Sequence, residues 1–172
     1  MIDSLETRLH SVMDDGAMVH AMLRGIDAFD RYRTQLPVKT DGYTRTLLYK
    51  TSGFELVAML WSPKSVSPIH DHGESRCWVV VMEGMLDVEN YDRRDEREMN
   101  AEIVHASSMT VNRGELDHRL SWRELHRVRN TGTAGAYSLQ LYAPSLTTYT
   151  VVQEESGICR TVPALYDSLF DL

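Results

Sequence analysis

Two histidines two positions apart, His70 and His72, stand just ahead of an apolar run in the segment SPIHDHGESRCWVVVMEG, residues 67–84. In a strand, residues i and i+2 point to the same face, so these two imidazoles would be neighbours. Neighbouring imidazoles are typical of a shared metal ion, because neutral histidine nitrogen is a common metal ligand in proteins. The pair therefore predicts half of a metal site, which a distant part of the chain has to complete.

The third ligand is expected from a strand far along the chain. His126 and His118 are the candidates, with His105 behind them. His10 and His20 fall in a helical region and are expected at the surface. Three imidazoles leave coordination positions open, as in iron oxygenases, although zinc or nickel could also fill such a set. A set without a carboxylate keeps the metal more positive, which favours an anionic sulfur donor such as a thiolate.

Two further stretches place polar side chains on one face of a predicted strand. In GYTRTLLYK, residues 42–50, Tyr43 and Arg45 alternate onto one face. An arginine that points into a β-fold needs an anion, and its planar guanidinium matches a carboxylate; an exposed position on an edge strand is the alternative. In YSLQLYAP, residues 137–144, the face shared by Ser138, Gln140 and Tyr142 predicts a polar cavity, or contact with solvent if that strand lies at the surface.

The elements that must position these residues follow from periodicity. Residues 3–32 show helical spacing of apolar side chains, with a break at Asp14, Asp15 and Gly16. Residues 40–152 form short β-rich stretches separated by turn residues; TSG after Lys50 indicates a hairpin, and Glu83-Gly84 a turn. Such spacing predicts a mainly β sandwich or barrel. We expect one domain, with residues 153–172 as a C-terminal tail.

In this order, the residues resemble a known signature. The H-x-H at 70–72, the turn glycine Gly84 and HRVRN at 126–130 are similar to the two-part motif of the cupin superfamily, double-sheet β-barrels of jelly-roll type. Within that superfamily the chain resembles the cysteine dioxygenase family over roughly residues 40–150. The matching features are the cysteine five positions after the H-x-H, a histidine within LHRVRN, a tyrosine within SLQLYAP and a Tyr-x-Arg.

The resemblance implies a mainly β, cupin-type jelly roll with N-terminal helices. It implies an Fe(II) site whose ligands are His70, His72 and His126. L-Cysteine would bind through its thiolate and amine, with its carboxylate on Arg45 and Tyr43, and both atoms of O2 would end on the sulfur as cysteine sulfinic acid. The family's eukaryotic-type members join the matching cysteine and tyrosine as a thioether, which here would link Cys77 and Tyr142.

Two positions complicate the resemblance. Cys77 stands where many cupins have a glutamate ligand, and its odd number would turn it away from His70 and His72 along an uninterrupted strand. A bulge or turn near Gly73 must therefore intervene; otherwise Cys77 is a small buried hydrophobic residue. Gln140 stands where the family often has histidine, and it can hydrogen-bond Tyr142 but cannot relay a proton as imidazole can.

The composition limits the partners. The chain has 172 residues and a net charge of −7, which argues against nucleic acid or an anionic membrane surface. It has no long apolar run, and its first residues lack an apolar signal core, so we expect a cytoplasmic protein. Its two cysteines, Cys77 and Cys159, form no CxxC pair, and in a reducing compartment we expect no disulfide. A monomer that binds a small thiol and O2 is the expectation.

Three alternatives remain open at this point. A dioxygenase for another small thiol, such as 3-mercaptopropionate, would resemble the family closely; such relatives tend to lack the arginine of Tyr-x-Arg, so Arg45 favours an amino-acid thiol. A metal-dependent isomerase or decarboxylase of the cupin type would need no cysteine–tyrosine pair. A non-catalytic cupin would be favoured by loss of a metal histidine, and none is lost.

Overall fold

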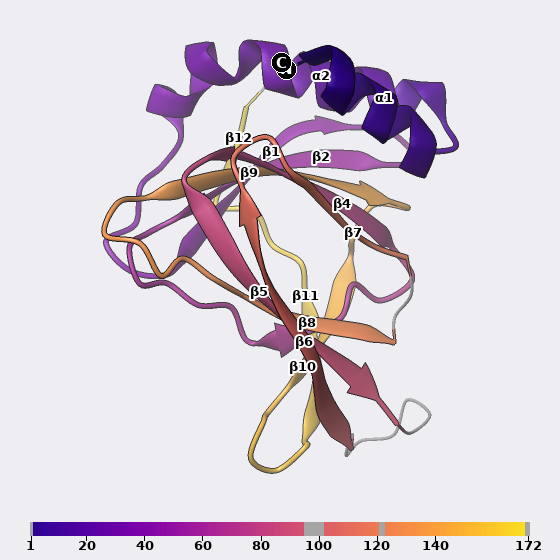
Figure 1. Cartoon of the computed structure of the whole chain (residues 1–172), viewed down its shortest axis with the longest axis vertical. Helices are drawn as coiled ribbons and strands as arrows, with labels where there is room; N and C mark the ends of the chain where they lie inside the picture. The colour runs from indigo at the N-terminus through magenta and orange to yellow at the C-terminus, as the bar shows by residue number, and fades with distance from the viewer. Residues whose placement is uncertain (1, 95–101, 121–122, 171–172) are drawn as a thin grey trace.

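The computed structural model describes residues 2–94, 102–120 and 123–170 (Figure 1). The chain begins with two helices, α1 (Ile2–Val12) and α2 (Gly16–Tyr32), and a short 3-10 helix at Arg33–Gln35. The first six strands are β1 (Tyr43–Lys50), β2 (Glu55–Trp61), β3 (Ile69–His70), β4 (Arg76–Glu83), β5 (Met85–Arg93) and β6 (Ile103–Asn112). They are followed by β7 (Leu116–Arg119), β8 (Glu124–Arg129), β9 (Ala136–Ala143), β10 (Thr148–Val152), β11 (Cys159–Pro163) and β12 (Ser168–Leu169).

The strands form two six-stranded sheets that do not close into one continuous ring within the described residues. The first sheet has the order β12-β1-β2-β9-β4-β7, and the second has the order β11-β10-β3-β8-β5-β6. Both helices lie across the first sheet, at the top of Figure 1, and the second sheet extends away from them. The predicted mainly β, double-sheet fold with N-terminal helices is confirmed.

A capping side chain starts α2, and close contacts attach both helices to the first sheet. The Asp15 side chain accepts a hydrogen bond from the Ala17 amide at 2.7 Å, which caps α2 at the predicted break. Inside α2, a Cβ at Gly25 would lie 2.9 Å from a methyl of Leu56, so a glycine lets the helix approach β2 closely. The Trp78 indole donates to the Val12 carbonyl at 3.1 Å and attaches the end of α1 to β4.

The first sheet is buried on both faces, because it separates two cores. On β2, Leu56 and Ala58 pack under the helices, whereas Val57, Met59 and Trp61 face the second sheet. The same alternation holds along β4 and β9. Polar residues on the inner face of this sheet therefore lie in the space between the two sheets, where water is scarce and each polar atom needs a partner.

The predicted hairpin and turns are present, and two of the turns carry the chain between sheets. TSG joins the antiparallel pair β1 and β2. Gly84, with φ of +75°, links β4 of the first sheet to β5 of the second. Gly73, with φ of +57°, lies where the chain passes from β3 to β4, and a Cβ there would be 2.8 Å from the Thr148 carbonyl oxygen. The His72 carbonyl accepts from the Ser75 amide at 2.9 Å and closes this turn.

The strands extend beyond residue 152, where the sequence predicted the β-region to end. β11 pairs with β10, and β12 runs parallel to β1. Both are short edge strands without an apolar alternation, so their pairing rests on backbone hydrogen bonds that the sequence pattern does not display. No helix among the described residues is long and apolar enough to span a bilayer.

Candidate metal centre

Three histidines converge in the space between the sheets. His70 on β3 lies directly opposite His126 on β8, because these two strands pair antiparallel at that position. His72 follows two residues later, at the start of the Gly73 turn. The candidate ligand nitrogens of all three lie within 4.8 Å of one another, and the Nε2 atoms of His70 and His126 are 3.2 Å apart.

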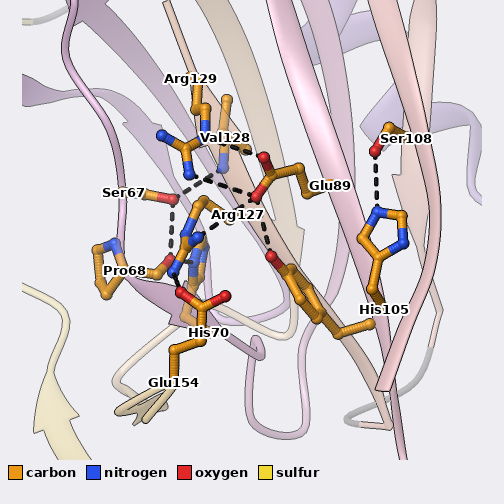
Figure 2. A network of polar contacts seen from close by, with 11 residues as sticks. Ser67, Pro68, His70, Glu89, His105, Ser108, Arg127, Val128, Arg129 and Glu154 are labelled. Carbon is orange, nitrogen blue, oxygen red and sulfur yellow. Dashed lines mark hydrogen bonds and ion pairs between the residues drawn. The ribbon is translucent and has the colours of Figure 1, made fainter. Parts of the chain in front are cut away.

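The other two candidates for the third ligand lie elsewhere. His105 is exposed on β6, where its Nε2 contacts the Ser108 hydroxyl at 2.9 Å (Figure 2). His118 lies opposite Trp78 in the β4–β7 pair, and that face of β4 packs under the helices. His126 is therefore the histidine that the fold brings to the H-x-H pair.

A chain of hydrogen bonds orients His70 (Figure 2). Its Nδ1 contacts the Pro68 carbonyl at 3.0 Å, and the Ser67 hydroxyl donates to the same carbonyl at 3.0 Å. Ser67 in turn accepts from the Val128 amide of β8 at 2.9 Å. Because a carbonyl can only accept, Nδ1 carries the proton and the Nε2 lone pair points toward the other two histidines.

Burial keeps the three imidazoles neutral. Desolvation lowers the pKa of His70 to about 4, and it lowers the pKa values of His72 and His126 well below their ordinary range, with the neighbouring histidines adding to the effect. The Nδ1 atoms of His72 and His126 are buried and have no hydrogen-bond partner within the described residues. Three neutral nitrogen donors, already converged, fit a divalent transition metal such as iron, zinc or nickel.

Cys77 and Tyr142 lie beside this centre. They are opposite each other in the β4–β9 pair and are 0% and 2% exposed. The Tyr142 ring centroid is 5.6 Å from that of His72. The Gly73 turn thus resolves the register problem, since it moves the chain to the other sheet before Cys77. Burial raises the pKa of the Cys77 thiol to about 12 and raises that of Tyr142, so both groups keep their protons.

The polar face predicted on β9 points into the space between the sheets. The Tyr142 hydroxyl donates to the Gln140 side-chain oxygen. The Gln140 amide reaches the Ser138 hydroxyl at 3.5 Å, and the Trp61 indole donates to the same hydroxyl at 3.0 Å. This series of contacts fixes the orientation of Tyr142 from one side.

Arg45 and Tyr43 also face this space. The Arg45 guanidinium carbon lies 5.4 Å from the centre of the Tyr142 ring, and its side chain is 11% exposed. Its Nε and Nη2 atoms are buried without a hydrogen-bond partner in the part of the chain that is described. The Tyr43 ring packs against Trp61 at 4.8 Å, and burial raises its pKa to about 12. The site thus presents a cation and a phenol beside the three histidines.

Three inward-facing charged residues were not anticipated from the sequence. Glu55 begins β2 on the face of Val57, and its Oε1 lies 4.0 Å from Arg45 Nη2. On β7, Arg119 lies opposite Cys77 and pairs with Asp117 at 2.7 Å. Alternation along FELVAMLW and ELDHRL shows which residues share a face, but it does not show which face of each strand meets the second sheet.

Comparison with known proteins completes the assignment. The profile of the family described as cysteine dioxygenase type I matches residues 15–155. The chain belongs to the cysteine dioxygenase type I family. Cysteine dioxygenase type 1 of Rattus norvegicus and that of Mus musculus are each 30% identical over 146 residues, covering 84% of this chain and 68% of the relative. The Danio rerio protein is 28% identical over 144 residues, covering 83% and 67%.

Solved structures support the fold of this cysteine dioxygenase family member. A Klebsiella pneumoniae protein described as having a double-stranded β-helix domain matches with a TM-score of 0.54 and 14% identity, over 72% of this chain and 93% of that one. The cupin domain of Schizosaccharomyces pombe Cnp3 matches with a TM-score of 0.50 and 10% identity, over 64% and 66%. The resemblance to the family and its cupin fold, inferred from the sequence, is confirmed.

Proposed function

We propose that this thiol dioxygenase family member binds Fe(II) through His70, His72 and His126 and oxidises L-cysteine to cysteine sulfinic acid. The observation that carries the proposal is the convergence of three neutral histidines beside Arg45, within the residues that match the family. When bound, the iron supplies the redox chemistry that joins O2 to sulfur. The protein supplies the binding, orientation and shielding of the reactants.

Arg45 is the residue that holds the substrate carboxylate in this proposal. Its buried Nε and Nη2 hydrogens lack hydrogen-bond acceptors within the described chain, and a carboxylate can accept two parallel N–H bonds from a guanidinium. The Tyr142 ring lies against the guanidinium and limits its movement. Tyr43, whose ring packs against Trp61, supplies its hydroxyl as the second contact for the same carboxylate in this proposal.

Tyr142 keeps its proton and acts by position. Its hydroxyl donates to Gln140, and an amide oxygen can accept this bond but does not take the proton away. Burial raises the pKa of Tyr142, and this higher pKa also keeps the phenol protonated. Gln140 and Ser138 therefore hold the phenol in place beside His72, where a histidine at position 140 would in addition offer a proton-transfer group.

Cys77 and Tyr142 are placed to form a thioether during turnover. They are cross-strand partners with both side chains in the space between the sheets, so a new S–C bond would not require a shift in register. The bond forms between the Cys77 sulfur and a ring carbon of Tyr142. Two protons and two electrons, together equivalent to two hydrogen atoms, leave the thiol and the ring, and O2, a substrate of the proposed reaction, accepts them and becomes hydrogen peroxide.

The chain acts, in this proposal, as one domain and as a monomer in the cytoplasm. The helices and both sheets surround one centre, and β12 pairs with β1, the strand that carries Arg45. Residues from both ends of the described chain thus contribute to the same fold. Size-exclusion chromatography with light scattering would test the monomer, and a chain that elutes as a stable dimer would contradict it.

Isotopically labelled dioxygen tests the proposed reaction. Fe(II)-loaded protein is incubated with L-cysteine, and the product is identified by mass spectrometry. We expect both labelled oxygen atoms in cysteine sulfinic acid. His126→Ala should form none above background, whereas His105→Ala, which removes an exposed histidine outside the centre, should match the wild type. Incorporation of one atom or none by the wild type would refute a dioxygenase of this substrate.

A further inference from the structure

Glu55 is a fully buried carboxylate in the space between the sheets. It is 0% exposed and lies opposite Tyr142 in the β2–β9 pair. Val57 and Met59 follow it on the same face of β2 and belong to the core between the sheets. An acid is rarely retained at such a position unless charged or polar partners compensate for its desolvation.

Only half of this carboxylate has hydrogen-bond partners. Oε2 accepts from the Lys50 ammonium at 3.0 Å and from the Tyr166 hydroxyl at 2.5 Å. Oε1 has no hydrogen-bond partner among the described residues and lies 4.0 Å from Arg45 Nη2, which has none either. Two buried atoms of opposite charge thus face each other at a separation too long for a direct hydrogen bond.

The residues that follow β11 hold both members of this pair in place. Tyr166 anchors Glu55 through its hydroxyl. Its neighbour Asp167 accepts from the Arg45 amide at 2.8 Å, and the Asp167 amide donates to the Arg45 carbonyl at 2.7 Å. These contacts fix the Glu55 carboxylate and the backbone of Arg45, from which the guanidinium extends toward Glu55 Oε1.

This arrangement discriminates between ligands by their charge. A ligand that offers Arg45 only a carboxylate places a second anion close to Glu55, in surroundings where like charges repel strongly. A ligand that carries an amino group beside its carboxylate offers an acceptor to Arg45 and an N–H donor to Glu55 Oε1, and a primary amine keeps N–H donors when its nitrogen also binds a metal. The ligand with an amino group gives a partner to both Arg45 Nη2 and Glu55 Oε1. The ligand without one gives a partner to Arg45 alone, at an electrostatic cost.

We infer that Glu55 is a specificity-determining residue that makes the Arg45 subsite selective for amino-acid thiols over thiol acids without an amino group. This inference rests on the proposed function, since it assigns the substrate class of the same site. It also explains why an arginine that is to bind a substrate anion is accompanied by an internal acid. In this role Glu55 lowers the affinity of Arg45 for ligands that carry only a carboxylate, so that amino acids bind more tightly than they do.

The test compares Glu55→Gln with a matched control. Glu89 on β5 is also held by a tyrosine hydroxyl and by cations, Tyr91 at 2.9 Å and Arg129 at 3.1 Å. It lies opposite Arg127 in the β5–β8 pair, and therefore on the face of that sheet away from His126. Binding of L-cysteine and of 3-mercaptopropionate to Fe(II)-loaded protein is measured by calorimetry without O2. We expect Glu55→Gln to lower the ratio of the two affinities at least about tenfold, whereas Glu89→Gln keeps the wild-type ratio.

The outcomes separate this inference from the proposed function. An unchanged affinity ratio in folded Glu55→Gln would overturn the specificity role, and an equal loss for both thiols would reduce Glu55 to a structural support. If Glu55→Gln does not fold, the double variant Lys50→Met/Glu55→Gln replaces it. In the double variant the Lys50 ammonium is removed together with the anion that it pairs with. A wild-type protein that binds neither thiol would refute the proposed function, and this inference with it.

Discussion

Replacement of Ser67 by alanine should make the candidate metal centre less rigid without changing any of its three histidines. Ser67 is 3% exposed; its hydroxyl accepts from the Val128 amide and donates to the Pro68 carbonyl that orients His70. Ser67→Ala leaves the Val128 amide buried without an acceptor, which costs about 1–3 kcal/mol. For a domain of this size, that loss lowers the melting temperature by roughly 2–12 °C.

The same variant should also weaken metal binding. Pro68 keeps its contact with the His70 Nδ1, but the carbonyl loses the second hydrogen bond that fixes its direction. Partners outside the ligand set typically change metal affinity by about 10–100-fold, and this indirect one should fall near the lower limit. We therefore expect Fe(II) affinity, measured anaerobically by competition with a chelator, to decrease about tenfold.

Ser108→Ala is the matched control for this experiment. Ser108 also hydrogen-bonds a histidine, His105, but on the exposed face of β6 (Figure 2). We expect it to change stability by less than about 0.5 kcal/mol and to leave Fe(II) affinity as in the wild type. A Ser67→Ala protein that loses stability but binds Fe(II) as the wild type does would refute the orienting role of this hydrogen-bond chain.

Three further predictions concern the centre itself. In metal-free protein, burial lowers the pKa of His70 from 6.5 to about 4, so the unfolded state takes up the proton first as the pH falls. Protonation of His70 should therefore reduce the free energy of unfolding by about 1–2 kcal/mol between pH 7 and pH 5. Denaturant titrations that show no such loss would contradict this prediction. His72→Ala should abolish stoichiometric Fe(II) binding in equilibrium dialysis, and full occupancy would remove it from the ligand set. After turnover, intact-mass spectrometry should find a population lacking two hydrogen atoms, absent from Cys77→Ser; the same population in that variant would rule out a link between Cys77 and Tyr142.

The sequence predicted the parts of the centre that depend on local spacing. His70 and His72 were identified by their separation, and the turn near Gly73 was required by the odd position of Cys77. The choice among three candidates for the third ligand was different. His126 is 56 residues from His70, and only the pairing of β3 with β8 places them together. From the residues alone, His118 remained a candidate for the third ligand, and the resemblance to the family was needed to prefer His126.

The charged residues of the inner face show where sequence reasoning ended. Alternation states that Glu55 and Val57 share a face, but not that this face meets the second sheet. β2 is buried on both sides, so its hydrophobic pattern carries no sign of which side holds the site. Tyr166 and Asp167 depend on the return of the chain to β1, which is a long-range arrangement. These contacts could be found only from the fold.

Oxygen consumption by the Fe(II)-loaded protein tests the central claim most directly. L-Cysteine and 3-mercaptopropionate are offered separately, and the products are identified by mass. We predict consumption of one O2 per thiol with L-cysteine, with cysteine sulfinic acid as the product, and a much slower reaction with 3-mercaptopropionate. A reaction with 3-mercaptopropionate alone would keep the centre and its chemistry but contradict the substrate, and no consumption with any small thiol despite bound iron would contradict the dioxygenase.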